Sequence, residues 1–279
     1  ISAASHYPAG RSMRIRENYP TLGDSYHSGE LNPSWWARTF PSWAFYRQIV
    51  KIVFSAAGKC KRSAYDDEAW CVSSYDTLRA LEGVGIPVHI EGLCHVKGHD
   101  GPCVFVGNHM SALETLILPA MIYPYKECSF VVKKILVDGK IFGPIMRQLQ
   151  PIAVGRDNPR EDLKNVLNEG TALLKKNRSV LIFPQTTPTA DFDPAHLNTL
   201  GAKLAKRAGV KLIPVALKTD FWVPGKLLRD FGTIYPDRDV HAAFGPPIEV
   251  SGNGREAHEQ AVDFIGTHLK EWGVECKVT

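Results

Sequence analysis

Residues 103–122 read CVFVGNHMSALETLILPAMI and join two different hydrophobic patterns. The first part, CVFVGN (103–108), is a short apolar run with β-branched and aromatic residues, which is typical of a buried strand. The second part, 112–122, is long enough for a helix, and Ser111 stands at its expected N-cap. A strand that leads through a short turn into a helix is the repeating unit of a parallel sheet covered by helices.

The same alternation continues on both sides of this stretch. Further strands are expected at 86–92, 129–133, 151–155, 179–184, 211–217 and 241–248, and further helices near 141–149, 159–177, 194–208 and 255–272. The pattern predicts an α/β fold with a mostly parallel central sheet flanked by helices. In such sheets the functional residues lie in the loops at the carboxyl ends of the strands.

The N-terminal part of the chain has a different composition. Residues 35–57, WWARTFPSWAFYRQIVKIVFSAA, combine aromatic, aliphatic and basic residues as a helix at a membrane interface does. The alternative is a buried helix whose long basic side chains reach solvent. A second helix is expected at about 64–84, and no run of about 18 uncharged apolar residues predicts a membrane-spanning helix. The expected organisation is an irregular N-terminal arm at 1–34, an interfacial helical pair at 35–84 and an α/β domain at 85–279.

Composition narrows the classes of function. The net charge is +4 and the chain has no dense basic run with interleaved aromatics, so we expect no nucleic-acid partner. Six cysteines without a CxxC pair indicate free thiols in a reducing compartment. The histidines away from 109 show no metal-ligand spacing, so no metal site is predicted for them; they include His95, His99, His196, His241, His258 and His268.

His109 and Glu114 are the residues best suited to chemistry. Five positions on one helix would separate their side chains, so they can meet only if His109 precedes the helix and Glu114 lies in its first turn. A neutral imidazole can then take a proton from a substrate hydroxyl, and the carboxylate orients the ring. The alternative is a capping box, in which Glu114 merely accepts from the Ser111 amide and His109 is an ordinary turn residue.

Four segments in order resemble the conserved blocks of the lysophospholipid acyltransferase family, whose bacterial members include the 1-acyl-glycerol-3-phosphate acyltransferases. Asn108-His109 with Glu114 is similar to the first block, in which Asp is usual and Glu is a minority variant. The Lys133 segment follows it, and Pro151 to Asp157 resembles the second block. Leu181 to Pro184 is similar to the start of the third block, and Leu212 to Leu217 to the fourth. The resemblance spans about residues 86–250.

The third block departs from the family pattern. Gln185-Thr186-Thr187-Pro188 stands where the family has Glu-Gly-Thr-Arg, and an Arg binds phosphate in a way that Thr and Pro cannot reproduce. The resemblance implies that Arg156 and Lys133 are the remaining phosphate anchors. Separately, we expect backbone amides near Gly155 or Thr186 to stabilise the oxyanion. The implied substrate-binding residues are Asn108, Ser111, Lys133, Gly155, Arg156, Pro184, Gln185, Thr186 and Thr187.

The function implied by this resemblance is transfer of a fatty acyl group to the hydroxyl of a lysophospholipid or related lipid. Acyl-CoA or acyl-carrier protein would be the co-substrate, with no metal or organic cofactor. We expect a peripheral protein on the cytoplasmic face of a membrane, and no oligomeric state is predicted. The alternatives are a glycolipid or aminolipid acceptor, or an inactive lipid-binding member of the fold. An esterase is disfavoured because the chain lacks a GxSxG motif.

Overall fold

The computed structural model describes residues 22–139, 142–155, 157–185, 187–223 and 232–277. These residues form one eight-stranded sheet in the order β1-β2-β8-β7-β3-β6-β4-β5. The strands are β1 (Tyr26–His27), β2 (Val88–Glu91), β3 (Val104–Gly107), β4 (Cys128–Lys133), β5 (Ile152–Val154), β6 (Ser179–Ile182), β7 (Leu212–Lys218) and β8 (Val240–Phe244).

Most neighbouring strands are parallel, which confirms the predicted fold class. Strands β7, β3, β6, β4 and β5 all run in one direction, whereas β8 is antiparallel to β7. Strand β8 ends at Phe244, earlier than expected, because Pro246 and Pro247 lack the amide hydrogens that continue a ladder. Strand β1 lies inside the arm that we expected to be irregular, and two residues are too few to give a periodic signal.

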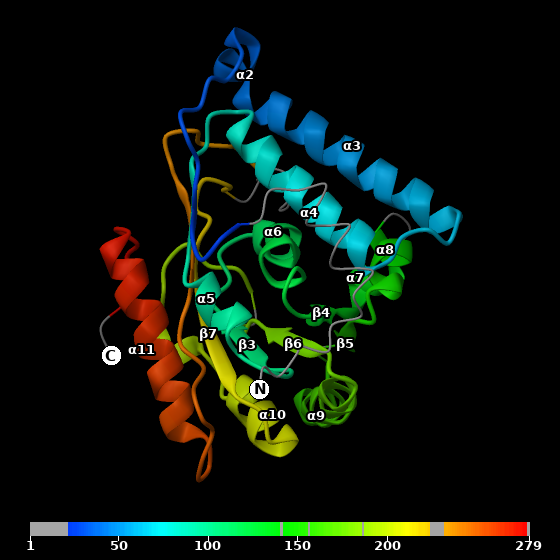
Figure 1. The fold of residues 1–279 in the computed structure, drawn as a ribbon, viewed down its shortest axis with the longest axis vertical. Coiled ribbons are helices and arrows are strands. Elements are labelled where there is room, and N and C mark those ends of the chain that lie inside the picture. Colours follow the sequence, from blue (N-terminus) through cyan, green and yellow to red (C-terminus); the bar gives the residue numbers. More distant parts are fainter. Residues whose placement is uncertain (1–21, 140–141, 156, 186, 224–231, 278–279) are drawn as a thin grey trace, which may run out of the picture.

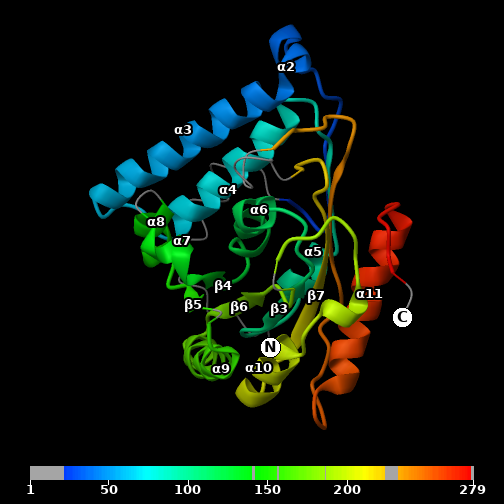
Figure 2. The ribbon, with the colours of Figure 1, turned by 180° about the vertical axis from the view of Figure 1, so that it is seen from behind.

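Helices cover both faces of the sheet (Figures 1 and 2). One face packs on α3 (Pro41–Lys61), α4 (Asp67–Glu82) and α6 (Leu113–Ile122), and the other on α9 (Pro159–Lys175), α10 (Leu200–Ala208) and α11 (Arg255–Glu271). Strand β3 shows the pleat that separates the two cores, because Phe105 faces the first and Val104 and Val106 face the second. The remaining helices are short: α2 (Trp35–Thr39), α5 (Leu93–Lys97), α7 (Lys134–Asp138), α8 (Phe142–Gln148) and the 3-10 turn η1 (Pro194–His196).

The helix expected over 35–57 is divided into α2 and α3 at Pro41. Proline suits the first turn of a helix, where its missing amide hydrogen costs nothing, so α3 starts anew at this residue. Phe45 is fully buried against Phe221 and Trp222, whereas Trp35 and Phe54 are 74% and 66% exposed. None of the helices that the structure describes is both long enough and apolar enough to cross a bilayer.

Helix α6 carries Glu114, and α4 holds α6 in place. Pro119 lies inside α6 and removes one backbone donor from it. The buried Ser74 of α4 donates its hydroxyl to the Leu116 carbonyl and accepts from the Ala120 amide at 3.0 Å, so the groups around the proline are hydrogen-bonded. This contact fixes the position of the helix that carries Glu114.

All six cysteines are free thiols, as predicted. Cys103 and Cys128 lie in the core, where burial raises the pKa of the Cys103 thiol to about 12. A thiol that stays protonated is neither a nucleophile nor a metal ligand. These two cysteines therefore act as small apolar side chains.

Candidate active site

The predicted catalytic pair lies at the carboxyl edge of the sheet. His109 follows β3, Gln185 follows β6 and Thr219 follows β7, and these three strands are adjacent in the order β7-β3-β6. Because parallel strands end at the same edge, residues far apart in sequence meet there.

His109 and Glu114 contact one another directly. The Nδ1 atom of His109 lies 3.0 Å from Oε2 of Glu114. Helix α6 begins at Leu113, so Glu114 lies in its first turn and His109 precedes it, as the spacing required. The N-cap position is Ala112 and not Ser111 as expected, since Ser111 turns its hydroxyl to accept from the Leu113 amide at 3.1 Å.

Glu114 is fully buried and its carboxylate is held by several donors. Oε1 accepts from the amides of Met110 at 3.0 Å and Ser111 at 2.8 Å, and from the hydroxyl of Thr219. The capping interaction and the histidine contact therefore exist together on one carboxylate, whose Oε2 also accepts from the Ser111 amide at 3.1 Å. A buried carboxylate needs such donors to offset its lost hydration.

This arrangement defines the tautomer of His109. A carboxylate that accepts at Nδ1 holds the ring proton there, so Nε2 carries the lone pair. Phe183 stacks on the imidazole with ring centroids 4.6 Å apart and planes tilted by 15°. The His109 side chain keeps 17% exposure while Glu114 has none, so only the histidine can meet a substrate.

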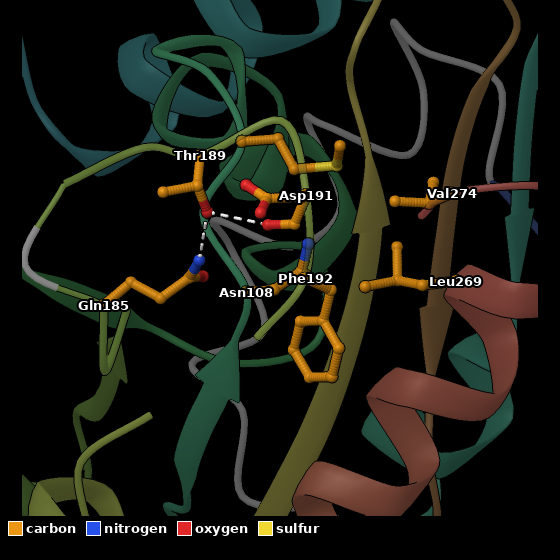
Figure 3. A pocket seen from close by; sticks show the side chains of 8 residues that line it. Asn108, Gln185, Thr189, Asp191, Phe192, Leu269 and Val274 are labelled. Atoms are coloured by element: carbon orange, nitrogen blue, oxygen red, sulfur yellow. Dashed lines mark hydrogen bonds between the residues drawn. The ribbon is translucent and has the colours of Figure 1, made fainter. Parts of the chain in front are cut away.

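Gln185 and Asn108 support the backbone on either side of His109. Gln185 is buried, accepts from the His109 amide and donates to the Thr189 hydroxyl at 2.7 Å, as Figure 3 shows for the second bond. The Asn108 amide pairs with both backbone groups of Leu217, at 2.7 and 2.8 Å. Both residues were expected to bind substrate, yet both side chains are engaged within the protein. Ser111 is likewise buried, and its hydroxyl donates to that of Thr219 at 2.9 Å.

A small hollow lies beside this turn, on the side of α11 (Figure 3). It is too shallow to enclose even a water molecule, so it does not hold a long acyl chain. Its lining residues are Asn108, Met110, Gln185, Thr189, Asp191, Phe192, Leu269 and Val274.

The other predicted substrate residues spread along the same edge. Lys133 ends β4, two strands from β3, and Gly155 follows β5, one strand further, so they lie ~10 and ~14 Å away by strand spacing. The Gly155 amide donates to Asp162 at 3.0 Å and therefore does not serve the oxyanion. Pro184 is buried, with its carbonyl accepting from Asn198.

The three remaining residues that were predicted to bind substrate are Arg156, Thr186 and Thr187. Thr187 is exposed in the turn after Gln185. Arg156 and Thr186 lie outside the described residues, so their expected roles stay predictions.

Three residues of the site were missed from sequence. Thr219 holds Glu114, Phe183 stacks on His109, and Thr189 both accepts from Gln185 and donates its amide to the His109 carbonyl at 3.0 Å. The available signal was that Phe183 and Thr219 lie near the carboxyl ends of two expected strands, at the edge where chemistry was expected.

Comparison with known proteins shows which enzymes this chain resembles. An acyltransferase family model matches residues 87–218, which include His109, Glu114 and Gln185. A 1-acyl-sn-glycerol-3-phosphate acyltransferase of Pseudomonas aeruginosa is 29% identical over 189 residues, 67% of this chain and 68% of that protein. These similarities, which cover about half to two thirds of the chain, support an acyltransferase of the 1-acyl-sn-glycerol-3-phosphate type.

Two further similarities extend this result. The chloroplast 1-acyl-sn-glycerol-3-phosphate acyltransferase BAT2 of Brassica napus is 29% identical over 46% of this chain, which is 36% of its own length. The crystal structure of the 1-acyl-sn-glycerophosphate acyltransferase PlsC from Thermotoga maritima matches with a TM-score of 0.62 at 18% identity, over 86% of this acyltransferase and 98% of that chain. This likeness shows that the two proteins share a fold.

Proposed function

We propose that this O-acyltransferase moves a fatty acyl group from acyl-CoA or acyl-carrier protein to the hydroxyl of a lysophospholipid or related lipid. The observation that carries the proposal is the His109–Glu114 contact of 3.0 Å, with the carboxylate fully buried and the imidazole still accessible. A ring oriented in this way is a general base for a hydroxyl.

In the proposed reaction, Nε2 of His109 takes the proton of the acceptor hydroxyl while its oxygen attacks the thioester carbonyl carbon. The tetrahedral intermediate then expels the thiolate as the carbon–sulfur bond breaks. The imidazolium returns its proton to the sulfur, which leaves as a thiol. Glu114 stabilises the imidazolium between the two steps, and no metal or organic cofactor takes part.

The acceptor is the open part of this proposal. Lys133 is a cation at the end of β4, on the carboxyl edge of the sheet. A lysophospholipid whose hydroxyl lies at His109 could place its phosphate near Lys133. A non-phosphate acceptor, such as a glycolipid or aminolipid, is the second candidate. It is considered because Pro188 stands in the third block where the family pattern has an Arg that can bind phosphate. Lysophosphatidate and neutral lyso-lipids with the same acyl chain distinguish the two candidates.

The acyltransferase would act from the surface of a membrane, on the cytoplasmic face. Trp35, Trp36, Phe40 and Trp43 form an exposed aromatic group on α2 and the start of α3, with Phe54 further along α3. The Arg47 guanidinium lies 5.7 Å from the Trp43 ring centre, which adds a cation at this surface. Such a combination binds anionic interfaces.

Release of free thiol from long-chain acyl-CoA tests the proposed reaction. We expect acceptor-dependent release that falls at least ~10³-fold in His109→Ala, with the exposed His196→Ala as a matched control that keeps activity. If acyl-CoA is not used, acyl-carrier protein is the next donor. Vesicle binding without turnover by any donor and acceptor would instead favour an inactive lipid-binding protein.

Co-sedimentation with anionic vesicles tests the membrane surface. The double variant Trp35→Ser, Phe54→Ser should bind at least ~10-fold more weakly, because each large apolar side chain contributes roughly 2 kcal/mol when buried. Leu163→Ser on α9 is the control, because α9 lies on the other side of the sheet from α3 (Figure 1). If the double variant bound vesicles as tightly as Leu163→Ser, α2 and α3 would not form the membrane interface.

A further inference from the structure

A row of histidines crosses neighbouring strands of the sheet outside the acyl-transfer site. His27 of β1 pairs with His89 of β2, and His89 pairs with His241 of β8. Paired positions on neighbouring strands direct their side chains to the same face, and the rings of His89 and His241 stack with centroids 4.7 Å apart. Asp239 directly precedes β8 and contributes a carboxylate to this row.

Three electron-rich atoms of this row converge on one point. One ligand atom each of His89, His241 and Asp239 lies within 4.8 Å of the other two. Oδ2 of Asp239 is 3.8 Å from Nε2 of His89 and 3.9 Å from Nε2 of His241. These separations are too long for direct hydrogen bonds. They are close to the ~3.4 Å between ligand atoms around a tetrahedral Zn²⁺ ion with bonds of ~2.1 Å.

His27 determines which nitrogen of His89 can face an ion. The Nδ1 atoms of His27 and His89 lie 3.1 Å apart, so one must donate its proton to the other. When His89 is the donor, its Nε2 presents a lone pair towards Asp239. A histidine that donates its other ring hydrogen to a neighbour is the usual arrangement around a bound metal.

We propose that His89, His241 and Asp239 form a Zn²⁺ site, with His27 as the hydrogen-bonding partner of His89. Two imidazoles and one carboxylate are a donor set that suits this ion. The three side chains keep 26%, 21% and 45% exposure, so water can reach the fourth position. Contraction of the two measured separations by about half an ångström would bring Asp239 to tetrahedral spacing from both rings, whose own ligand atoms lie within 4.8 Å of one another.

The surroundings of the row are compatible with a cation. The Lys218 ammonium, on the neighbouring strand β7, lies 3.1 Å from Oδ1 of Asp220 and donates to the Asp239 carbonyl at 3.2 Å, so its charge is partly offset by Asp220, which Arg238 shares. Trp272, after α11, stacks on His241 with centroids 5.0 Å apart and so limits the movement of that ring. A bound ion would fasten β2 to β8 and, through His27, support the pairing of β1.

Equilibrium dialysis of the chelator-treated full chain against Zn²⁺ tests the site, with bound metal measured by mass spectrometry. We expect one ion per chain and a metal-dependent rise in Tm, both lost in His89→Gln and in His241→Gln. His27→Gln should weaken binding by ~10-fold, as loss of an outer partner does. The pair of exposed His196 and half-buried Asp193 provides the control, and His196→Gln should bind Zn²⁺ normally.

Co²⁺ substitution keeps the test informative if a variant folds poorly. The wild-type chain should give the visible absorption of a tetrahedral nitrogen and oxygen site, without a thiolate charge-transfer band. Absence of Zn²⁺ uptake by the wild-type chain would overturn the proposal, as would a thiolate band or unchanged binding in folded His89→Gln and His241→Gln. If water alone bridges the three side chains, the wild-type chain should take up no Zn²⁺.

Discussion

The molecule contains two groups of histidine and carboxylate that differ in distance and burial. Glu114 is fully buried and lies 3.0 Å from one ring of His109. Asp239 is 45% exposed and lies 3.8 and 3.9 Å from two rings. A close, buried carboxylate fixes one ring for proton transfer, whereas a more distant one facing two lone pairs leaves room for a cation. The same residue types therefore support different chemistry according to their separation.

Glu114→Gln should have the largest effect on the acyl-transfer group after removal of His109 itself. The amide can still accept from the Met110 and Ser111 backbone, but its NH2 group facing Nδ1 favours the wrong tautomer of His109. We expect kcat to fall by about 10²–10³-fold with little change in KM. Steady-state thiol release measures this, with the exposed Glu249→Gln as a control. A Glu114→Gln enzyme with wild-type kcat would reduce Glu114 to a helix cap.

Thr219→Val tests the support behind the carboxylate. Valine has the shape of threonine but lacks the hydroxyl, so Glu114 loses one donor and the Ser111 hydroxyl loses its acceptor. We expect kcat to fall by ~10-fold and the free energy of unfolding to fall by about 1–2 kcal/mol, the usual result of unpaired buried groups. Urea unfolding and turnover are measured together, and Thr219→Ser should restore both. Lost stability with unchanged kcat would make Thr219 structural only.

Gln185→Glu tests whether the altered third block selects the acceptor. A glutamate can accept from the His109 amide but cannot donate to Thr189, whose hydroxyl also bonds the Asp191 carbonyl. We expect kcat/KM to fall roughly 5-fold, equivalent to one hydrogen bond of ~1 kcal/mol. The order of preference among acceptors should not change, because Gln185 is buried and both ends of its side chain are engaged. A reversed order of preference among the acceptors would show that Gln185 contacts the acceptor.

Local patterns predicted the fold and the His109–Glu114 contact well. The strand before His109 and the helix after Ser111 are written in consecutive residues, so the meeting of His109 and Glu114 followed from one strand, one turn and one helix. Thr219 was missed because it reaches Glu114 from another strand, 105 residues away. The sequence also could not predict the partners of the Asn108 and Gln185 side chains. An amide group can hydrogen-bond either the backbone or a substrate.

The histidine row shows the same limit more strongly. His27, His89 and His241 come from three strands, and no spacing along the chain relates them. Only the strand register, His27 to His89 to His241, brings them together. Sequence reasoning that relied on ligand spacing therefore found no metal site among these histidines.

Of these changes, removal of the metal should have the smallest effect on turnover. It tests whether the histidine row and the His109–Glu114 pair are independent. They meet at the end of β7, because Lys218 pairs with His241 and Thr219, the first residue after the strand, bonds Glu114. The two residues bond different partners, so we expect little transmission between the two groups. Dialysis against a chelator should lower Tm yet change kcat by less than ~2-fold, as for independent sites. A kcat that falls on chelation and returns with Zn²⁺ would instead show that β7 couples the histidine row to the general base.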